Sequence, residues 1–171
     1  EMNEFKPNLS FIQDWFGHLR LNEYSSNRLF KSLILKDKQP SELIKLCEFS
    51  LREKWTLLYR GTRDGFGATD FHSKCDGIAN TLTVIKAKSG NIFGGFTEQK
   101  WHSRDGFITD PKAFIFSLVN KEERPFKVLC SNEGKQALRC NPIRGPCFGG
   151  EGDYIRDICI ESDSNLNKES Y

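Results

Sequence analysis

The sequence predicts an α+β protein in which strands dominate: a two-sheet antiparallel β-sandwich flanked by short helices, with an N-terminal helical leader. Three observations predict this class. Apolar residues at helical spacing are concentrated before residue 50, whereas later segments are short, β-rich and joined by turns. Phenylalanine is over-used, at 14 of 171 residues, which indicates an aromatic-rich core. With 37% hydrophobic and 28% charged residues, the composition is that of a globular chain.

The first fifty residues predict two helices. Apolar residues at helical spacing predict one over 9–19. Pro40 precedes Ser41, and this pair is a suitable start for a second helix whose apolar residues run to position 49. We therefore interpret 1–50 as a helical leader that packs on the main body, and 51–171 as the main domain.

From Trp55 onward the chain consists of short candidate strands between clusters of Gly, Pro and Asn. A turn at Ser89-Gly90-Asn91 joins two of them into a hairpin. One short helix interrupts the series at 68–75. The predicted strands are 55–61, 81–87, 91–97, 113–119, 126–130, 136–140, 146–150 and 154–161. Because turns and not long helices link successive strands, we expect antiparallel sheets.

Two glycine-rich segments need an interpretation. Three glycines in 61–67 precede the helix at 68–75, but no Gly-Lys-Ser/Thr follows, so a phosphate-binding loop is disfavoured and a tight turn is favoured. Gly94 and Gly95 lie inside a predicted strand, where paired glycines indicate a bulge or close sheet packing.

Composition excludes several functional classes. The net charge is only +2 and no basic run interleaved with aromatics is present, so we expect no nucleic-acid partner. The apolar runs are too short for a transmembrane helix. His72 and Cys75 have the spacing of half a zinc site, but no second half lies nearby, so we expect no metal and no cofactor.

The six cysteines permit three disulfides in fifteen connectivities, and no pair has the C-x-x-C spacing. We expect reduced thiols in an intracellular domain, with an extracellular disulfide-bonded domain as an alternative. A second alternative is an enzyme that handles thiols or peroxides, using Cys75 as the nucleophile and His72 as its partner. The favoured interpretation is that Cys75 points into the core and that neither residue is catalytic.

Four ordered blocks resemble the TLDc domain: KWTLLYRGTRDGFGATDFHSKCDG (54–77), NTLTVIKAKSGNIFGGFTEQKW (80–101), DPKAFIFSLVNK (110–121) and GPCFGG (145–150). The resemblance spans roughly 50–171. Family domains usually continue with a further strand pair, so we expect a domain that is incomplete at its C-terminus. The family's signature positions correspond here to Gly61, Asp64, Gly65, Asp76, Gly94, Gly95, Glu98, Asp110 and Gly149.

The resemblance implies a two-sheet sandwich and a regulatory role. TLDc domains are linked to protection against oxidative stress, and several bind the vacuolar proton-pumping ATPase and regulate its assembly. No catalytic reaction is firmly assigned to them. We therefore expect a non-enzymatic, cytoplasmic interaction module that reaches organelle membranes only through its partner. The glycines of the signature are interpreted as structural. The expected contacts lie in loops 61–66, 98–110 and 144–153, with the acidic residues Asp64, Asp76, Glu98 and Asp110 as candidate partner-binding groups.

Overall fold

The computed structural model describes residues 16–22, 32–50, 54–130, 132–150 and 157–166. Ten strands are found in these ranges: β1 Phe16–Asn22, β2 Lys54–Arg60, β3 Thr81–Lys86, β4 Ile92–Thr97, β5 Gly106–Ile108, β6 Phe114–Val119, β7 Phe126–Leu129, β8 Leu138–Cys140, β9 Arg144–Phe148 and β10 Ile158–Glu161. The helices are α1 Gln39–Leu46, α2 Gly61–Asp64, α3 Ala68–Cys75 and the 3₁₀ turn η1 Asn132–Gly134.

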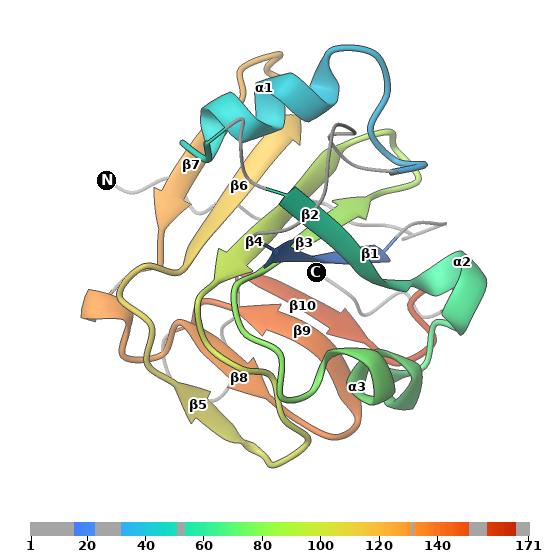
Figure 1. The fold of residues 1–171 in the computed structure, drawn as a ribbon, viewed down its shortest axis with the longest axis vertical. Coiled ribbons are helices and arrows are strands. Elements are labelled where there is room, and N and C mark those ends of the chain that lie inside the picture. Colours follow the sequence, from blue (N-terminus) through green and yellow to red (C-terminus); the bar gives the residue numbers. More distant parts are fainter. Residues whose placement is uncertain (1–15, 23–31, 51–53, 131, 151–156, 167–171) are drawn as a thin grey trace.

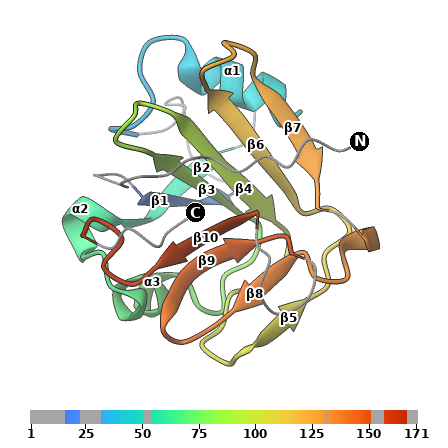
Figure 2. The same ribbon diagram turned by 180° about the vertical axis from the view of Figure 1, so that it is seen from behind.

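The strands form two antiparallel sheets, as the sequence predicted. The six-stranded sheet has the order β2-β1-β3-β4-β6-β7, and the four-stranded sheet has the order β10-β9-β8-β5. Figure 1 shows the two sheets as layers, with α1 beside β6 and β7 and with α3 at the other end of the molecule. The reverse view in Figure 2 shows the four-stranded sheet in front.

Both faces of the central strands of the six-stranded sheet are covered, and this explains why nearly every residue of β3 and β4 is buried. Ile85 and Phe93 belong to the core between the two sheets. Leu82 and Val84, which alternate with Ile85 along β3, belong to a second core that includes Leu43 of α1. Successive residues of β3 and β4 are therefore buried, and these include the polar Thr81, Thr83 and Thr97.

The paired glycines of β4 permit two close approaches, one to the facing sheet and one to the neighbouring strand of the same sheet. A Cβ at Gly95 would lie 2.8 Å from the ring of Phe148, in the four-stranded sheet. A Cβ at Gly94 would collide with the carbonyl oxygen of Thr83 on β3. The expectation of close sheet packing is therefore confirmed. A register shift between Ile92 and Phe93 in the pairing with β6 adds a local irregularity.

The predicted helix over 9–19 is wrong for its second part, because β1 occupies Phe16–Asn22; residues 9–15 lie outside the described ranges. The backbone of β1 pairs with β2 on one side and with β3 on the other. Those two hydrogen-bonding edges outweigh the local helical spacing. The second helix of the leader is present as α1, and it begins two residues before Ser41, with Pro40 in its first turn.

Three loop expectations also need correction. The 61–66 segment contains one helical turn, α2, and only Gly65 there has the positive φ of the expected tight turn, at +107°. The 98–110 segment contains β5, which pairs with β8. The 144–153 segment begins as β9, paired on both sides.

Candidate functional site

Asp64 closes the α2 turn. Its Oδ2 accepts a hydrogen bond of 2.8 Å from the backbone N–H of Arg60. The Arg63 guanidinium donates to both carboxylate oxygens, at 2.8 and 2.7 Å. These hydrogen bonds from Arg63 hold the pKa of Asp64 below its ordinary value. Most of the acceptor capacity of this carboxylate is therefore used within the fold.

Asp110 joins the end of β4 to the start of β6. Its carboxylate is buried and accepts from the Thr97 hydroxyl at 2.6 Å and from the Glu98 N–H at 2.8 Å. The Lys112 N–H donates to the other oxygen at 3.0 Å. Glu98 lies beside it and forms a 3.0 Å ion pair with the Lys112 ammonium. The structure thus brings Glu98 and Asp110 together, and Glu98 is the member exposed to solvent.

Asp76 ends α3 and orients His72. One carboxylate oxygen lies 2.7 Å from His72 Nδ1, and the other accepts a 2.5 Å hydrogen bond from the Ser103 hydroxyl. His72 Nε2 faces the carbonyl oxygens of Asn141 and Arg144, at 2.9 and 3.0 Å. The imidazole therefore lies between a carboxylate and two backbone carbonyls. His72 ties α3 to the turn between β8 and β9.

The geometry disfavours catalysis by Cys75 and His72. The Cys75 side chain is fully buried, and desolvation raises the pKa of its thiol well above the ordinary value. A nucleophilic cysteine needs accessible thiolate. The described residues show no hydrogen bond between Cys75 and His72, whose ring nitrogens face Asp76 and two backbone carbonyls.

The remaining signature glycines lie where a side chain has no room. A Cβ at Gly65 would collide with the carboxylate of Asp70. One at Gly61 would lie 2.6 Å from the Phe66 ring. Gly149 has a φ of +68°, and a Cβ there would collide with the Asp157 carboxylate. As at Gly94 and Gly95, an added Cβ at these positions would lie too close to neighbouring atoms.

The described residues contain no group of three or more His, Cys, Asp or Glu side chains able to hold a metal ion. A shallow pocket lined by Tyr59, Phe66, Phe71, Ile160 and neighbouring residues has room for about one water molecule. Within the described ranges, no helix combines the length and apolar character that a membrane span requires.

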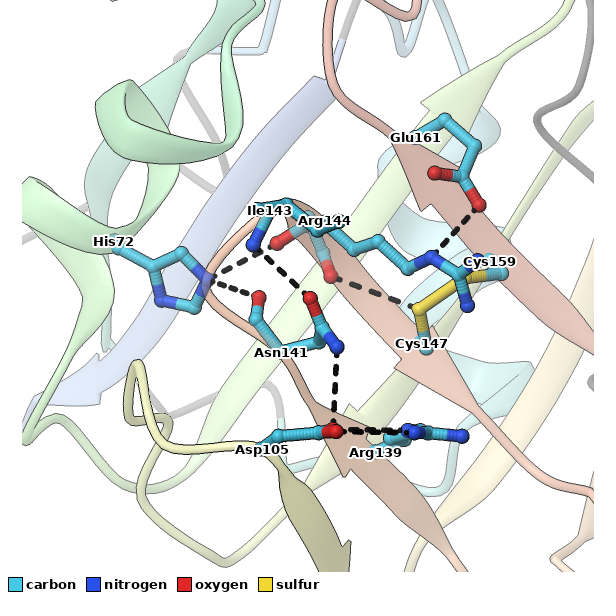
Figure 3. The surroundings of a disulfide bond; sticks show 10 residues. His72, Asp105, Arg139, Asn141, Ile143, Arg144, Cys147, Cys159 and Glu161 are labelled. Carbon is cyan, nitrogen blue, oxygen red and sulfur yellow. Dashed lines mark hydrogen bonds and ion pairs between the residues drawn. A yellow bond between two sulfur atoms is a disulfide. The ribbon is translucent and has the colours of Figure 1, made fainter. Parts of the chain in front are cut away.

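The expectation of reduced thiols is wrong for one cysteine pair. Cys147 and Cys159 form a disulfide between β9 and β10. The other four cysteines, at positions 47, 75, 130 and 140, are free and buried. Figure 3 shows the bridge with Arg144 and Glu161 beside it. The sequence contained an indication of this pair. If the predicted strands 146–150 and 154–161 form a hairpin centred on residue 153, Cys147 and Cys159 face each other, because each lies six residues from that centre.

Sequence reasoning also missed a polar network at the same end of the four-stranded sheet. Arg139 on β8 donates to the Asp105 carboxylate at 3.1 and 3.2 Å, and Asn141 donates to it at 3.1 Å. The hydrogen bonds from Arg139 lower the pKa of Asp105. These partners are more than thirty residues apart in sequence, so no local motif indicates them.

Comparison with known proteins gives the context for this geometry. The model of the TLDc domain matches residues 29–171. The MTOR-associated protein MEAK7 of Danio rerio is 31% identical over 64 residues, 37% of this chain and 14% of that protein. That of Gallus gallus is 27% identical over 122 residues, 66% of this chain and 24% of the relative. Oxidation resistance protein 1 of Bos taurus is 27% identical over 89 residues, 49% of this chain and 10% of the relative.

The matched segments thus span a quarter or less of each of these relatives. The family match includes α1 and every later helix and strand of the structure. It therefore covers the four-stranded sheet, the six-stranded sheet apart from β1, both cores and all nine signature positions discussed above. The chain belongs to the TLDc domain family.

Proposed function

We propose that this chain is a non-enzymatic regulatory module that binds the cytoplasmic side of the vacuolar proton-pumping ATPase and thereby supports resistance to oxidative stress. The observation that carries the proposal is that the family's signature residues make contacts within the fold. Asp64 and Asp110 accept backbone N–H groups, and Gly94 and Gly95 permit close packing. These signature residues hold the fold together. We therefore interpret the domain as a rigid support for exposed binding loops and not as a catalytic centre.

The names of the relatives are compatible with this role, since they refer to association and to oxidation resistance and not to a reaction. The alternative, thiol or peroxide chemistry at Cys75 with His72, has little support. Its thiol is buried, the thiol pKa is raised, and the imidazole faces other partners.

Among the candidate acidic residues, Glu98 is the best placed to contact a partner. Its side chain is 38% exposed, and that of its ion-pair partner Lys112 is 69% exposed. An exposed ion pair contributes little to stability, so its charges can be changed without unfolding the domain. Asp64, Asp76 and Asp110 are less suitable, because their carboxylates are occupied by internal hydrogen bonds.

The proposed partner is tested by affinity capture of the purified ATPase with the full chain as bait. We expect retention of pump subunits. Retention of none by a bait shown to be folded, for example by a cooperative melting transition, would contradict the proposal.

A charge exchange then separates recognition from stability. We expect Glu98→Lys to weaken capture about tenfold, because it reverses a charge in the proposed interface. The double variant Glu98→Lys/Lys112→Glu restores the ion pair within the domain but presents the two charges to the partner in exchanged positions. Its capture of the ATPase should therefore remain weak. Glu122→Lys, in the exposed turn between β6 and β7, is the control. Recovery of binding by the double variant would show that Glu98 acts only through Lys112, and this pair would leave the proposed interface.

A further inference from the structure

Cys147 and Cys159 occupy facing positions on neighbouring strands. They pair directly in the antiparallel register of β9 and β10, with their Cα atoms 4.1 Å apart. Phe148, Ile158 and Ile160, next to them in sequence, belong to the core between the sheets. Alternation therefore places both cysteines on the opposite face of the four-stranded sheet. Both side chains are nevertheless fully buried.

The bridge joins an edge strand to its neighbour. β10 has four residues and ends the strand order of its sheet. Among the described strands it pairs only with β9. A short strand held along one edge is the kind of element that opens locally while the rest of a domain stays folded. A covalent bond in the middle of β10 opposes such opening.

The segment that begins at β10 covers the junction between α2 and α3. The Ser162 hydroxyl accepts from the Ala68 N–H at 3.2 Å, and the Asp163 N–H donates to the Phe66 carbonyl at 2.9 Å. Glu161 pairs with Arg144 of β9 at 3.0 Å. Ile160 lies over the same small pocket as Tyr59, Phe66 and Phe71. If 158–166 detached, this apolar lining would be exposed.

We infer that Cys147 and Cys159 form a redox-controlled latch: the disulfide holds residues 158–166 closed over the α2–α3 junction, and the dithiol lets this segment open. The inference is independent of the proposed partner. In the structure the Cys147 sulfur lies 3.7 Å from the Gly145 carbonyl oxygen, so on reduction its S–H would find an acceptor in place and the closed state would remain accessible. Redox state thus shifts the population of the open segment without being required for the fold.

The oxidant proposed is a hydroperoxide. One thiolate attacks a peroxide oxygen, the O–O bond breaks, and a sulfenic acid and hydroxide form. The second thiolate attacks the sulfenic sulfur, the S–S bond forms, and a second hydroxide leaves; the two thiol protons convert both hydroxides to water when the oxidant is hydrogen peroxide. A small dithiol reverses the reaction by two exchanges and becomes the oxidised partner. Because both sulfurs are buried, each direction requires transient opening of β10.

The bridge itself is tested on the wild-type chain with hydrogen peroxide and with dithiothreitol. After denaturation and alkylation, we expect four labelled cysteines in the oxidised sample and six in the reduced one, with 147 and 159 joined in the oxidised digest. Six labels in both samples, or a bridge between other cysteines, would overturn the inference.

The latch is tested by hydrogen exchange on the same two samples. We expect reduction to accelerate exchange at least tenfold at Ile158–Glu161 and at Asp163, while amides of β3 and β4 change less than twofold. Unchanged exchange in β10, or an equal acceleration in both sheets, would refute a local latch.

A variant gives an independent readout. Cys147→Ala/Cys159→Ala should exchange like the reduced protein under both conditions, whereas Cys47→Ala, which lacks a cysteine far from the bridge, should keep the redox response. Should the double variant not fold, the comparison of the two wild-type samples still decides between the outcomes.

Discussion

At the scale of single residues, the carboxylate of Asp110 is the clearest link between sequence signature and stability. It is buried and satisfies one hydroxyl and two backbone N–H groups. We expect Asp110→Ala to lower the free energy of unfolding by about 3 kcal/mol, because it leaves these donors without an acceptor. Asp110→Asn, which keeps one carbonyl acceptor, should lose less.

Urea denaturation of the two Asp110 variants measures this, with the exposed Glu122→Ala as a control expected to stay within about 0.5 kcal/mol of wild type. An Asp110→Ala protein as stable as the control would mean that water replaces the carboxylate at no cost.

Asp64 gives a pH-dependent prediction at the same scale. Hydrogen bonds from Arg63 lower its pKa in the folded state, so the unfolded chain binds the proton more readily. The contribution of Asp64 is therefore complete above the ordinary aspartate pKa of about 3.9 and is lost as the pH falls through the lowered folded value. The stability gap between wild type and Asp64→Asn should shrink as the pH falls from 6 to 3.

Urea midpoints at intervals across that range provide the measurement. Asp37→Asn, at an exposed position, controls for the removal of one negative charge. A gap that stays constant with pH would show that the hydrogen bonds from Arg63 do not discriminate between the two protonation states.

At the scale of elements, the contact between β4 and β9 sets how closely the sheets approach. Gly95 does not have a positive φ, and the atoms nearest to an added Cβ belong to the Phe148 ring, at 2.8 Å. We expect Gly95→Ala to destabilise the protein by about 2 kcal/mol through overpacking. Phe148→Leu removes the ring edge and lowers the free energy of unfolding by itself. The double variant should lose less stability than the sum of the two single losses predicts.

A double-mutant cycle of unfolding free energies checks this coupling, which we expect at about 1 kcal/mol. Strict additivity of Gly95→Ala and Phe148→Leu would mean that the two sheets separate to accept the methyl group, and that Gly95 is not the residue that fixes their distance.

The same scale explains what the sequence could and could not predict. Most strands after Trp55 were predictable because each carries its own alternation or apolar run between turn residues, whereas the three-residue β5 is too short to show either pattern. β1 was not, because its conformation depends on pairing with β2 and β3, which follow much later in the chain. The sequence identified the turn aspartates but not their roles. Asp110 accepts hydrogen bonds from N–H groups before and after it in the chain, and no local sequence pattern predicts that these groups come together.

At the scale of the whole molecule, the free cysteines report on how well both cores exclude water. Burial raises the pKa of Cys140 to about 11 and those of Cys47 and Cys130 to about 12, and it raises that of Cys75 further. In the unfolded chain these thiols ionise from about pH 8.5. The unfolded state therefore loses protons first, and stability, complete below that pH, falls as the pH rises toward the folded pKa values.

We expect the free energy of unfolding, measured by urea denaturation, to decline steadily between pH 8.5 and 10.5, by an amount on the order of 1 kcal/mol per thiol per pH unit. Alkylation of the native protein at pH 8 should modify the four free thiols slowly, at rates set by opening of the cores around them. Cys47 follows the last residue of α1 and belongs to the second core, whereas Cys75 belongs to the core between the sheets, so the two rates report on different cores. A thiol that reacts at the rate of a free cysteine in solution would identify a site that the packing leaves open, and such behaviour at Cys75 would restore the case for thiol chemistry there.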